Sequence, residues 1–354
     1  MNVSFRVDAG SRVGDGHAMR CLTLADALAE RGARTSFIFG SDVAEGLSET
    51  IGKNHRLFAM PSRGETGAAP WSESEDAEWT MRVLSENRLS PDWLVVDHYE
   101  LAREWENRLR SASEKLLVID DLANRPHTCD LLLDPTYAQT KMRYENLLPA
   151  HCRCLCGSEY ALLRPQFRRM RQQYSRELPR PEEMCVHVFF GSADAGNNTV
   201  RFSRILLDSF ASLRVRVAVG HAYLHRSQLQ RLAEQFGARF SWDAGIYDMA
   251  AHMAVCDVAL GAPGGTTWER ACIGLPSAYL AVSANQPEIL EQLQDSGLCA
   301  YFGRADEIGD AAFVDAMRDF LRNVPRLRSM RLTGMHAIDG GGAIRVADVL
   351  EQTR

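Results

Sequence analysis

The chain has 354 residues, 45% of them hydrophobic, and its 40 Lys and Arg residues against 46 Asp and Glu give a formal net charge of -6. This length favours two domains, and the net negative charge argues against a nucleic-acid-binding protein. The N-terminus lacks the basic-then-apolar form of a signal peptide, and no apolar run approaches the roughly 18 residues that span a bilayer. We therefore expect a soluble, cytoplasmic protein that engages neither nucleic acid nor membrane.

Short apolar runs rich in branched residues alternate with helical patterns through the first half of the chain. Several of these runs end in Asp, which is typical of buried strands at the carboxyl edge of a parallel α/β sheet. Ligands bind beyond this edge in such sheets. The expected strands are 3–7, 34–41, 93–98, 116–121 and 129–135, and a helix is expected at about 17–30.

A polar, charged stretch at 161–183, with prolines near its end, interrupts this pattern and predicts a linker. Strand and glycine-loop patterns then restart at 185–199, 214–220 and 257–282. We predict an α/β fold of two Rossmann-like domains whose parallel sheets face an interdomain cleft. The alternative of one large sheet is disfavoured by the central linker. The predicted parts are the domains 1–160 and 184–342, the linker 161–183 and a C-terminal helix at 343–354.

The stretch DAGSRVGDGHAMR at 8–20 places a histidine where a glycine-bearing turn becomes a helix. Histidine titrates near neutral pH, so His17 could act as a base, and Gly14 and Gly16 leave room beside it for a ligand. The simpler interpretation is a polar residue in the first turn of a helix. Nearby carboxylates that could orient the ring, bind a ligand or merely cap strand ends are Asp8, Asp15 and Asp97.

A glycine loop, LGAPGGTTWER at 260–270, follows a strand of the second half. Gly264 and Gly265 let the backbone approach a ligand closely, and Thr266 or Thr267 can cap a helix expected to start at Trp268. Backbone N–H groups at a helix start suit phosphate oxygens, but a tight capped turn explains the loop equally well. The loop lacks the lysine of a P-loop.

The loop FFGSADAGNNT at 189–199 has a similar form, with Gly191 and Ser192 at the end of its strand. Two such loops at one sheet edge favour a diphosphate ligand. Glu269 follows the other loop, where it could complement the helix dipole or accept hydrogen bonds from ribose hydroxyls.

The nine cysteines favour reduced thiols over a disulfide framework. Cys152, Cys154 and Cys156 alternate in HCRCLC at 151–156, which places them on one face of a strand. Because no second ligand pair follows at zinc-finger spacing, no metal site is expected.

Six segments that carry these features resemble, in order, the UDP-2,4-diacetamido-2,4,6-trideoxy-β-L-altropyranose hydrolases of pseudaminic acid biosynthesis. The likeness runs from about residue 3 to residue 286, and the block around His17 is its most specific part. The loop at 261–270 is shared more widely with GT-B glycosyltransferases. The segments are 5–28, 94–99, 116–137, 156–167, 189–199 and 261–277.

The resemblance implies a GT-B fold and hydrolysis of a UDP-sugar without metal or cofactor, in which the sugar C1–O bond is cut with inversion and UDP leaves. It implies that His17 is the catalytic base and that the second domain holds UDP, with Glu269 on the ribose. Asn285 and Gln286 match a family loop that reaches toward the sugar and phosphates, and Tyr99 matches a residue that lines the sugar side. Together with the residues singled out above, the predicted sugar-side residues are Gly14, Asp15, Gly16, Asp97, Tyr99 and Asn285. The predicted UDP-binding residues are Gly191, Ser192, Gly264, Gly265, Thr266, Thr267, Glu269 and Gln286.

The chain departs from the family's commoner pattern at four loop positions, which leaves the phosphate contacts and the exact sugar open. A GT-B glycosyltransferase, a hydrolase of a related UDP-diacetamido sugar and a non-enzymatic nucleotide-sugar sensor are the alternatives. The polar stretch at 41–80 disfavours a transferase with a lipid-linked acceptor, and His17 disfavours a sensor. The departures are Ser192, Ala195, Pro263 and Thr266.

Overall fold

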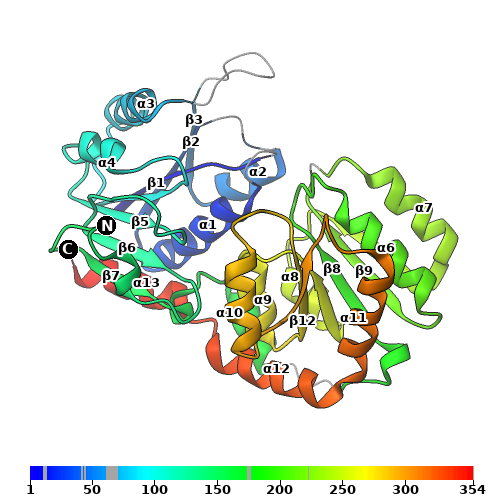
Figure 1. Ribbon diagram of the computed structural model, residues 1–354. Coiled ribbons are helices and arrows are strands. Elements are labelled where there is room, and N and C mark those ends of the chain that lie inside the picture. The colour runs from blue at the N-terminus through cyan, green and yellow to red at the C-terminus, as the bar shows by residue number, and fades with distance from the viewer. Residues whose placement is uncertain are drawn as a thin grey trace. The chain divides into compact units, whose positions relative to one another are not determined.

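The computed structural model describes residues 1–10, 14–40, 43, 45–60, 71–173, 177–221 and 223–353. The chain divides into two units, the first formed by 1–163 together with 341–354 and the second by 164–340 (Figure 1). Each unit has its own parallel sheet with helices against it. Within the described residues, no helix is long and apolar enough to cross a membrane.

The first unit contains a seven-stranded parallel sheet in the order β3-β2-β1-β4-β5-β6-β7. Its central strands are buried on both faces, which is why they read as continuous apolar runs in the sequence. The strands are β1 (Asn2–Val7), β2 (Arg34–Phe39), β3 (Arg56–Ala59), β4 (Trp93–Asp97), β5 (Lys115–Ile119), β6 (Leu131–Asp134) and β7 (Arg153–Cys156).

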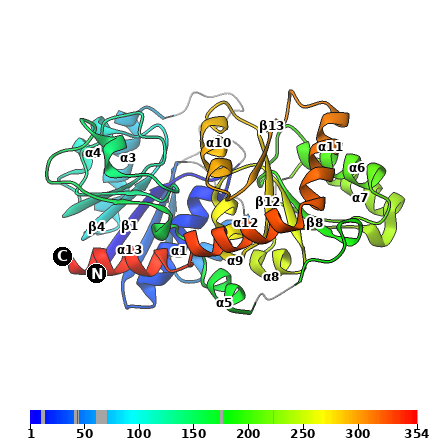
Figure 2. The same cartoon turned by 60° about the horizontal axis from the view of Figure 1, so that its bottom comes forward.

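Two apolar clusters fill the two faces of this sheet. The helices α1 (Gly16–Ala29), α2 (Glu45–Gly52) and α13 (Gly342–Gln352) pack on one face. The helices α3 (Glu73–Glu86) and α4 (Arg103–Leu109) pack on the other. Figure 2 shows α13 beside α1, and the indole N–H of Trp93 donates to the carbonyl of Leu350 at 3.1 Å. The last helix of the chain therefore completes the first unit.

The second unit contains a six-stranded parallel sheet in the order β10-β9-β8-β11-β12-β13. Alternate residues of β8 face its two sides: Val186 and Val188 belong to the core under α6, α7 and α11, whereas the ring of His187 contacts that of His252 in α8. The strands are β8 (Cys185–Phe189), β9 (Arg214–Val219), β10 (Phe240–Ala244), β11 (Val258–Gly261), β12 (Ser277–Ala281) and β13 (Ala300–Arg304). The helices are α5 (Pro165–Gln173), α6 (Asn198–Ser209), α7 (Arg226–Phe236), α8 (Met249–Ala254), α9 (Gly265–Ile273), α10 (Pro287–Asp295), α11 (Asp310–Arg322) and α12 (Val324–Ala337).

Both sheets have the doubly wound strand order, which reverses between β1 and β4 in the first unit and between β8 and β11 in the second. The prediction of two Rossmann-like parallel-sheet domains is confirmed, and the alternative of one large sheet is wrong. The strands β3 and β13 escaped prediction because each lies at a sheet edge and is only partly buried. Ligand-binding loops are expected at the two reversal points, where both motifs singled out in the sequence lie.

Candidate active site

His17 follows a glycine turn and lies where the strand order of the first sheet reverses, between β1 and β4. Gly14 has a φ of +73°, a left-handed conformation that favours glycine. Asp15 is the N-cap residue of α1, and the helix begins at Gly16. His17 therefore lies in the first turn of α1, beside the carboxyl ends of β1 and β4.

The ring of His17 contacts a buried carboxylate at the end of β4. Its Nδ1 atom lies 2.6 Å from Oδ1 of Asp97, whose side chain is fully buried, while the His17 side chain is 12% exposed. An ionised carboxylate only accepts hydrogen bonds, so Nδ1 donates the proton and Nε2 is left as the acceptor nitrogen. Asp97, one of the three carboxylates considered from the sequence, therefore contacts this ring.

Arg20, one turn further along α1, holds the same carboxylate. Its Nε lies 2.6 Å from Oδ2 of Asp97 and its Nη2 lies 2.6 Å from Oδ1. Nη2 also lies 3.1 Å from Nδ1 of His17. Burial alone would raise the pKa of Asp97, but the charge of Arg20 and the hydrogen bonds from Arg20 and His17 hold this pKa well below its usual range. Asp97 is therefore an anion at neutral pH.

Tyr99 and Asp121 extend this network. Nη1 of Arg20 lies 3.0 Å from Oδ2 of Asp121, which also hydrogen-bonds the Tyr99 hydroxyl. The edge of the Tyr99 ring meets the His17 ring, with centroids 4.7 Å apart and an interplanar angle of 89°. Burial, with the negative charge of Asp121, raises the pKa of Tyr99, so its hydroxyl stays protonated and donates. Tyr99 nevertheless remains 42% exposed and accessible to a ligand.

Asp8, at the end of β1, belongs to a neighbouring cluster. It accepts hydrogen bonds from Arg6 at 2.5 Å, from the backbone N–H of Gly40 at 2.8 Å and from Nε2 of His98 at 2.9 Å. Burial opposes ionisation here, but Arg6 and then His98 hold the pKa of Asp8 below its usual range. His98 is thus a partner of Asp8, whereas the carboxylate in contact with His17 is Asp97.

In the second unit, the glycine loop after β11 leads directly into α9. The helix begins at Gly265, earlier than the expected start at Trp268. Gly264 and Gly265 are exposed, and the N–H of Gly264 donates to Oγ1 of Thr267 at 3.1 Å. The first N–H groups of a helix have no partners within the helix, so this exposed turn can donate to an anion. Thr266 is partly exposed in the same turn.

Glu269 follows in α9 and is held by Arg164. Nη2 of Arg164 lies 3.3 Å from Oε1 of Glu269, and Nη1 donates to the carbonyl of Tyr247 at 2.8 Å. The Glu269 side chain is 15% exposed. Burial raises the pKa of Glu269, and the charge of Arg164 offsets this only in part. This carboxylate carries unused acceptor capacity close to the glycine loop.

The loop after β8 differs from the loop after β11. Gly191 has a φ of +106°, and the carbonyl of Ser192 accepts a hydrogen bond from Gly220 at 3.0 Å. Asp194, which the sequence analysis did not consider, accepts a hydrogen bond from the backbone N–H of Thr199 at 2.7 Å. The start of α6 therefore already has an anionic partner, whereas the start of α9 presents glycines to solvent.

The turn between β12 and α10 carries the last two predicted residues. Oε1 of Gln286 accepts hydrogen bonds from the backbone N–H groups of Val282 at 2.7 Å and Ser283 at 3.2 Å. Asn285 is exposed, and its Oδ1 accepts a hydrogen bond from the Ser283 hydroxyl at 2.7 Å. The side-chain oxygen of Gln286 thus shapes the turn, and its amide nitrogen is the group left to donate.

The structure gathers the predicted residues into two groups, one in each unit. Sequence reasoning gave no role to four further residues that hold these groups together. Two carried a signal: Arg20 lies three positions after His17 and so on the same helix face, and Asp121 is the second acid after β5. The first group is Gly14, Asp15, Gly16, His17, Asp97 and Tyr99. The second, at the ends of β8, β11 and β12, is Gly191, Ser192, Gly264, Gly265, Thr266, Thr267, Glu269, Asn285 and Gln286. The four further residues are Arg20, Asp121, Arg164 and Asp194.

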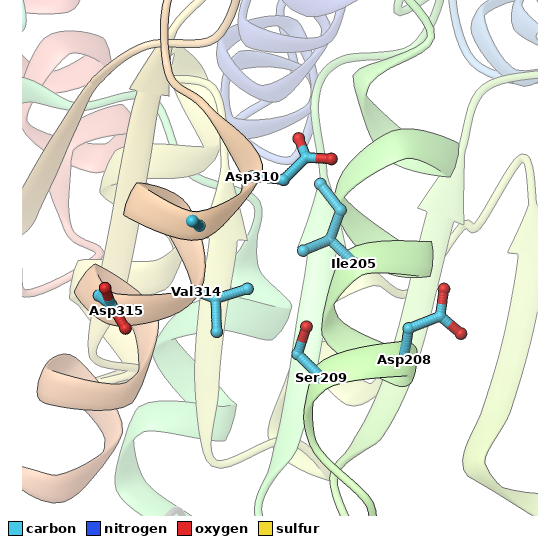
Figure 3. A pocket seen from close by; sticks show the side chains of 7 residues that line it. Ile205, Asp208, Ser209, Asp310, Val314 and Asp315 are labelled. Carbon is cyan, nitrogen blue, oxygen red and sulfur yellow. The ribbon is translucent and has the colours of Figure 1, made fainter.

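Other features of the described chain lie apart from these groups. Cys152, Cys154 and Cys156 pack against the same apolar cluster, as their alternation predicts. Among the described residues, no group of three or more His, Cys, Asp or Glu side chains could hold a metal ion. A hollow of about 400 Å³ between α6 and α11 contains none of the predicted residues (Figure 3). It is lined by Ile205, Asp208, Ser209, Asp310, Ala311, Val314 and Asp315.

Two characterised sequences align with much of the chain, although no protein-family profile matches it. The spore coat polysaccharide biosynthesis protein SpsG of Bacillus subtilis is 21% identical over 357 residues, which cover 99% of this chain and 98% of SpsG. The UDP-2,4-diacetamido-2,4,6-trideoxy-β-L-altropyranose hydrolase of Campylobacter jejuni is 27% identical over 204 residues, which cover 57% of this chain and 65% of the hydrolase.

Solved structures establish the class of fold. MurG of Acinetobacter baumannii aligns over 99% of both chains with a TM-score of 0.66 and 14% identity. S. aureus MnaA, solved with UDP, aligns over 99% of this chain and 96% of its own with a TM-score of 0.68 and 10% identity. A UDP-GlcNAc 2-epimerase of Neisseria meningitidis bound to UDP-GlcNAc gives a TM-score of 0.65 at 11% identity, over 99% of this chain and all of its own. The chain has the GT-B fold.

Proposed function

We propose that this protein is a UDP-sugar hydrolase that cuts the sugar C1–O bond of UDP-2,4-diacetamido-2,4,6-trideoxy-β-L-altropyranose with inversion, without metal or cofactor. The observation that carries the proposal is the hydrogen bond from Nδ1 of His17 to the buried Asp97, which leaves Nε2 as a base. The 27% identity to a Campylobacter jejuni hydrolase of this name supports the choice of substrate.

The first unit supplies the base in this proposal. Nε2 of His17 takes a proton from water as the water oxygen bonds to C1 of the sugar. The C1–O bond breaks, its electron pair leaves with the diphosphate, and the products are the free sugar and UDP. Asp97 fixes the tautomer of His17 and stabilises the imidazolium that forms, as the acid of a catalytic triad does. The exposed Tyr99 lines the sugar side.

The second unit supplies the UDP site. The backbone N–H groups of Gly265 and Thr266, in the exposed turn that opens α9, donate to the diphosphate and stabilise the charge that develops on it. Glu269 accepts hydrogen bonds from the ribose hydroxyls, with Arg164 holding its carboxylate in place. Because UDP is a good leaving group, the reaction needs no second carboxylate to protonate it.

A GT-B glycosyltransferase is the second candidate. It is favoured by the full-length alignment with SpsG, whose name places it in polysaccharide biosynthesis. Such an enzyme would use the same base on an acceptor hydroxyl, whereas a hydrolase uses water alone. A hydrolase of a related UDP-diacetamido sugar would share every residue assigned above.

The test is incubation of the purified protein with EDTA and a panel of UDP-sugars in ¹⁸O-labelled water. We expect UDP release without an acceptor, ¹⁸O in the sugar and not in UDP, and an inverted anomer as the first product seen by NMR. Retention of configuration, ¹⁸O in the diphosphate or a strict metal requirement would refute the hydrolase mechanism. Turnover that begins only when an acceptor sugar is added would favour the transferase.

A further inference from the structure

We infer that Arg20 is a positioning residue that ties the base His17 to the sugar-side Tyr99 and fixes the orientation of the imidazole. This role deepens the proposed function and rests on it. The Arg20 side chain is only 19% exposed, and its partners described above are two carboxylates and an imidazole nitrogen. It acts through the groups that it holds.

Three nitrogens of one guanidinium serve two carboxylates. Nε and Nη2 form a bidentate pair with Asp97, and Nη1 reaches Asp121. Asp97 also accepts a hydrogen bond from His17, and Asp121 accepts one from the Tyr99 hydroxyl. The edge of the Tyr99 ring in turn contacts the His17 ring. The five side chains therefore form a closed ring, and a bidentate fork fixes orientation in a way that a point charge cannot.

The charges of this ring act on His17 in opposite directions. Asp97, 2.6 Å from Nδ1, orients the ring through this hydrogen bond. Nη2 of Arg20 lies 3.1 Å from the same nitrogen and balances the negative charge of Asp97. The charged and titratable groups that the structure describes around His17 are Asp97 from β4, Arg20 and Cys21 from α1, Tyr99 after β4 and Asp121 after β5.

Other strand-end acids of this sheet show what a purely structural arginine does. Arg143 pairs with Asp134 at 2.7 Å, and Arg125 pairs with Asp120 at 2.8 Å. In these pairs the arginine also donates to backbone carbonyls, as Arg125 does to His98. The described contacts of Arg20 differ, because they include an imidazole nitrogen and two carboxylates that each lead to a proposed active-site side chain.

The test compares Arg20→Met, which removes the charge and the fork, with Arg20→Lys, which keeps the charge and loses the fork. Arg110→Met, which breaks an arginine pair with Asp130, is the control. Ring ¹⁵N NMR of the free enzyme reads the tautomer and titration of His17, whose signal among the ten histidines is identified by its loss in His17→Gln. UDP release is then followed against pH.

We expect Arg20→Met to lower kcat about 100-fold through misplacement of the base and to change the ring ¹⁵N signals that report the tautomer of His17. Arg20→Lys should lower kcat about tenfold, because its charge remains but its bidentate fork is lost. Arg110→Met should match the wild type. A wild-type tautomer of His17 in Arg20→Met would overturn the inference.

If Arg20→Met does not fold, the test rests on Arg20→Lys. A wild-type kcat in a folded Arg20→Lys enzyme would refute the positioning role of Arg20. If the wild-type protein releases no UDP from any substrate, the proposed function fails. The NMR comparison then still tests the effect of Arg20 on His17 without substrate. The two failures are therefore distinguishable.

Discussion

The two units share one strand order and differ in what they place at the point where it reverses. The first unit presents charged side chains, in which His17, Asp97 and Arg20 lie within hydrogen-bonding distance of one another. The second presents backbone, in which the exposed glycines at 264 and 265 open α9 and Glu269 is the nearby carboxylate. Equal topology therefore places the candidate residues at the same point of each sheet, and local sequence decides whether they are side chains suited to proton transfer or backbone groups suited to anion binding.

The largest effect is expected from His17→Gln, which removes the proposed base of the first unit. We expect kcat for UDP release to fall about 10²–10⁴-fold, because glutamine cannot accept the proton from water. UDP affinity, measured by calorimetry, should stay unchanged because the UDP contacts are assigned to the second unit. His336→Gln, at an exposed position of α12, is the matched control and should retain full activity. A parallel loss of UDP affinity would contradict the division of labour.

Asp97→Asn should weaken the folded state by about 3–5 kcal/mol, because it leaves Arg20 without its buried partner. The pKa of Asp97 is held below its unfolded value, so its stabilising contribution is present above that unfolded value and is lost as pH falls through the lower, folded one. Chemical denaturation at pH 7 and at pH 3 should therefore show a difference between variant and wild type that shrinks in acid. An equal difference at both pH values would contradict this account.

Glu269→Gln tests the second unit, where the pKa of Glu269 is shifted in the opposite sense to that of Asp97. Burial raises its pKa above the unfolded value, so ionisation costs stability once pH rises past that value. The variant should raise Tm by at most about 2 °C at pH 7 and show no gain near pH 4. It should also weaken UDP binding about tenfold through the loss of a charged acceptor, with kcat nearly unchanged. A large fall in kcat at saturating substrate would refute the binding role.

Asp194→Ala separates the two glycine loops of the second unit. Removal of the Asp194 carboxylate should cost about 1 kcal/mol of stability, because the N–H of Thr199 in the first turn of α6 loses its acceptor. UDP affinity should change less than about twofold, since the phosphate donors are assigned to the start of α9. If the loss of Asp194 strengthens UDP binding tenfold or more, α6 also faces the diphosphate.

The smallest effect is expected from the double variant Cys152→Ala, Cys154→Ala. These thiols pack against an apolar cluster and take no part in the groups described above. UDP release should stay within about twofold of the wild type, with or without EDTA. A loss of activity that added zinc restores would show that the thiols of Cys152, Cys154 and Cys156 bind a metal.

The fold could be predicted because buried parallel strands read as apolar runs that end in acids, as at 93–97 and 131–134. The position of His17 could be predicted because the glycine turn before it marks a helix start. Its partner could not be chosen among three carboxylates, since which strand lies beside β1 is a property of the sheet order. Arg164 could not be predicted either, because its contact with Glu269 joins residues 105 positions apart in the chain and depends on the fold.

The C-terminal helix α13 belongs to the first unit although the second unit precedes it in the chain. The polypeptide therefore passes between the units twice, and no single truncation releases either one intact. A fragment ending at residue 163 would expose the apolar face of α1 and leave the Trp93 indole without the Leu350 carbonyl. A self-sufficient first unit would require circular permutation, with 341–353 fused ahead of residue 1.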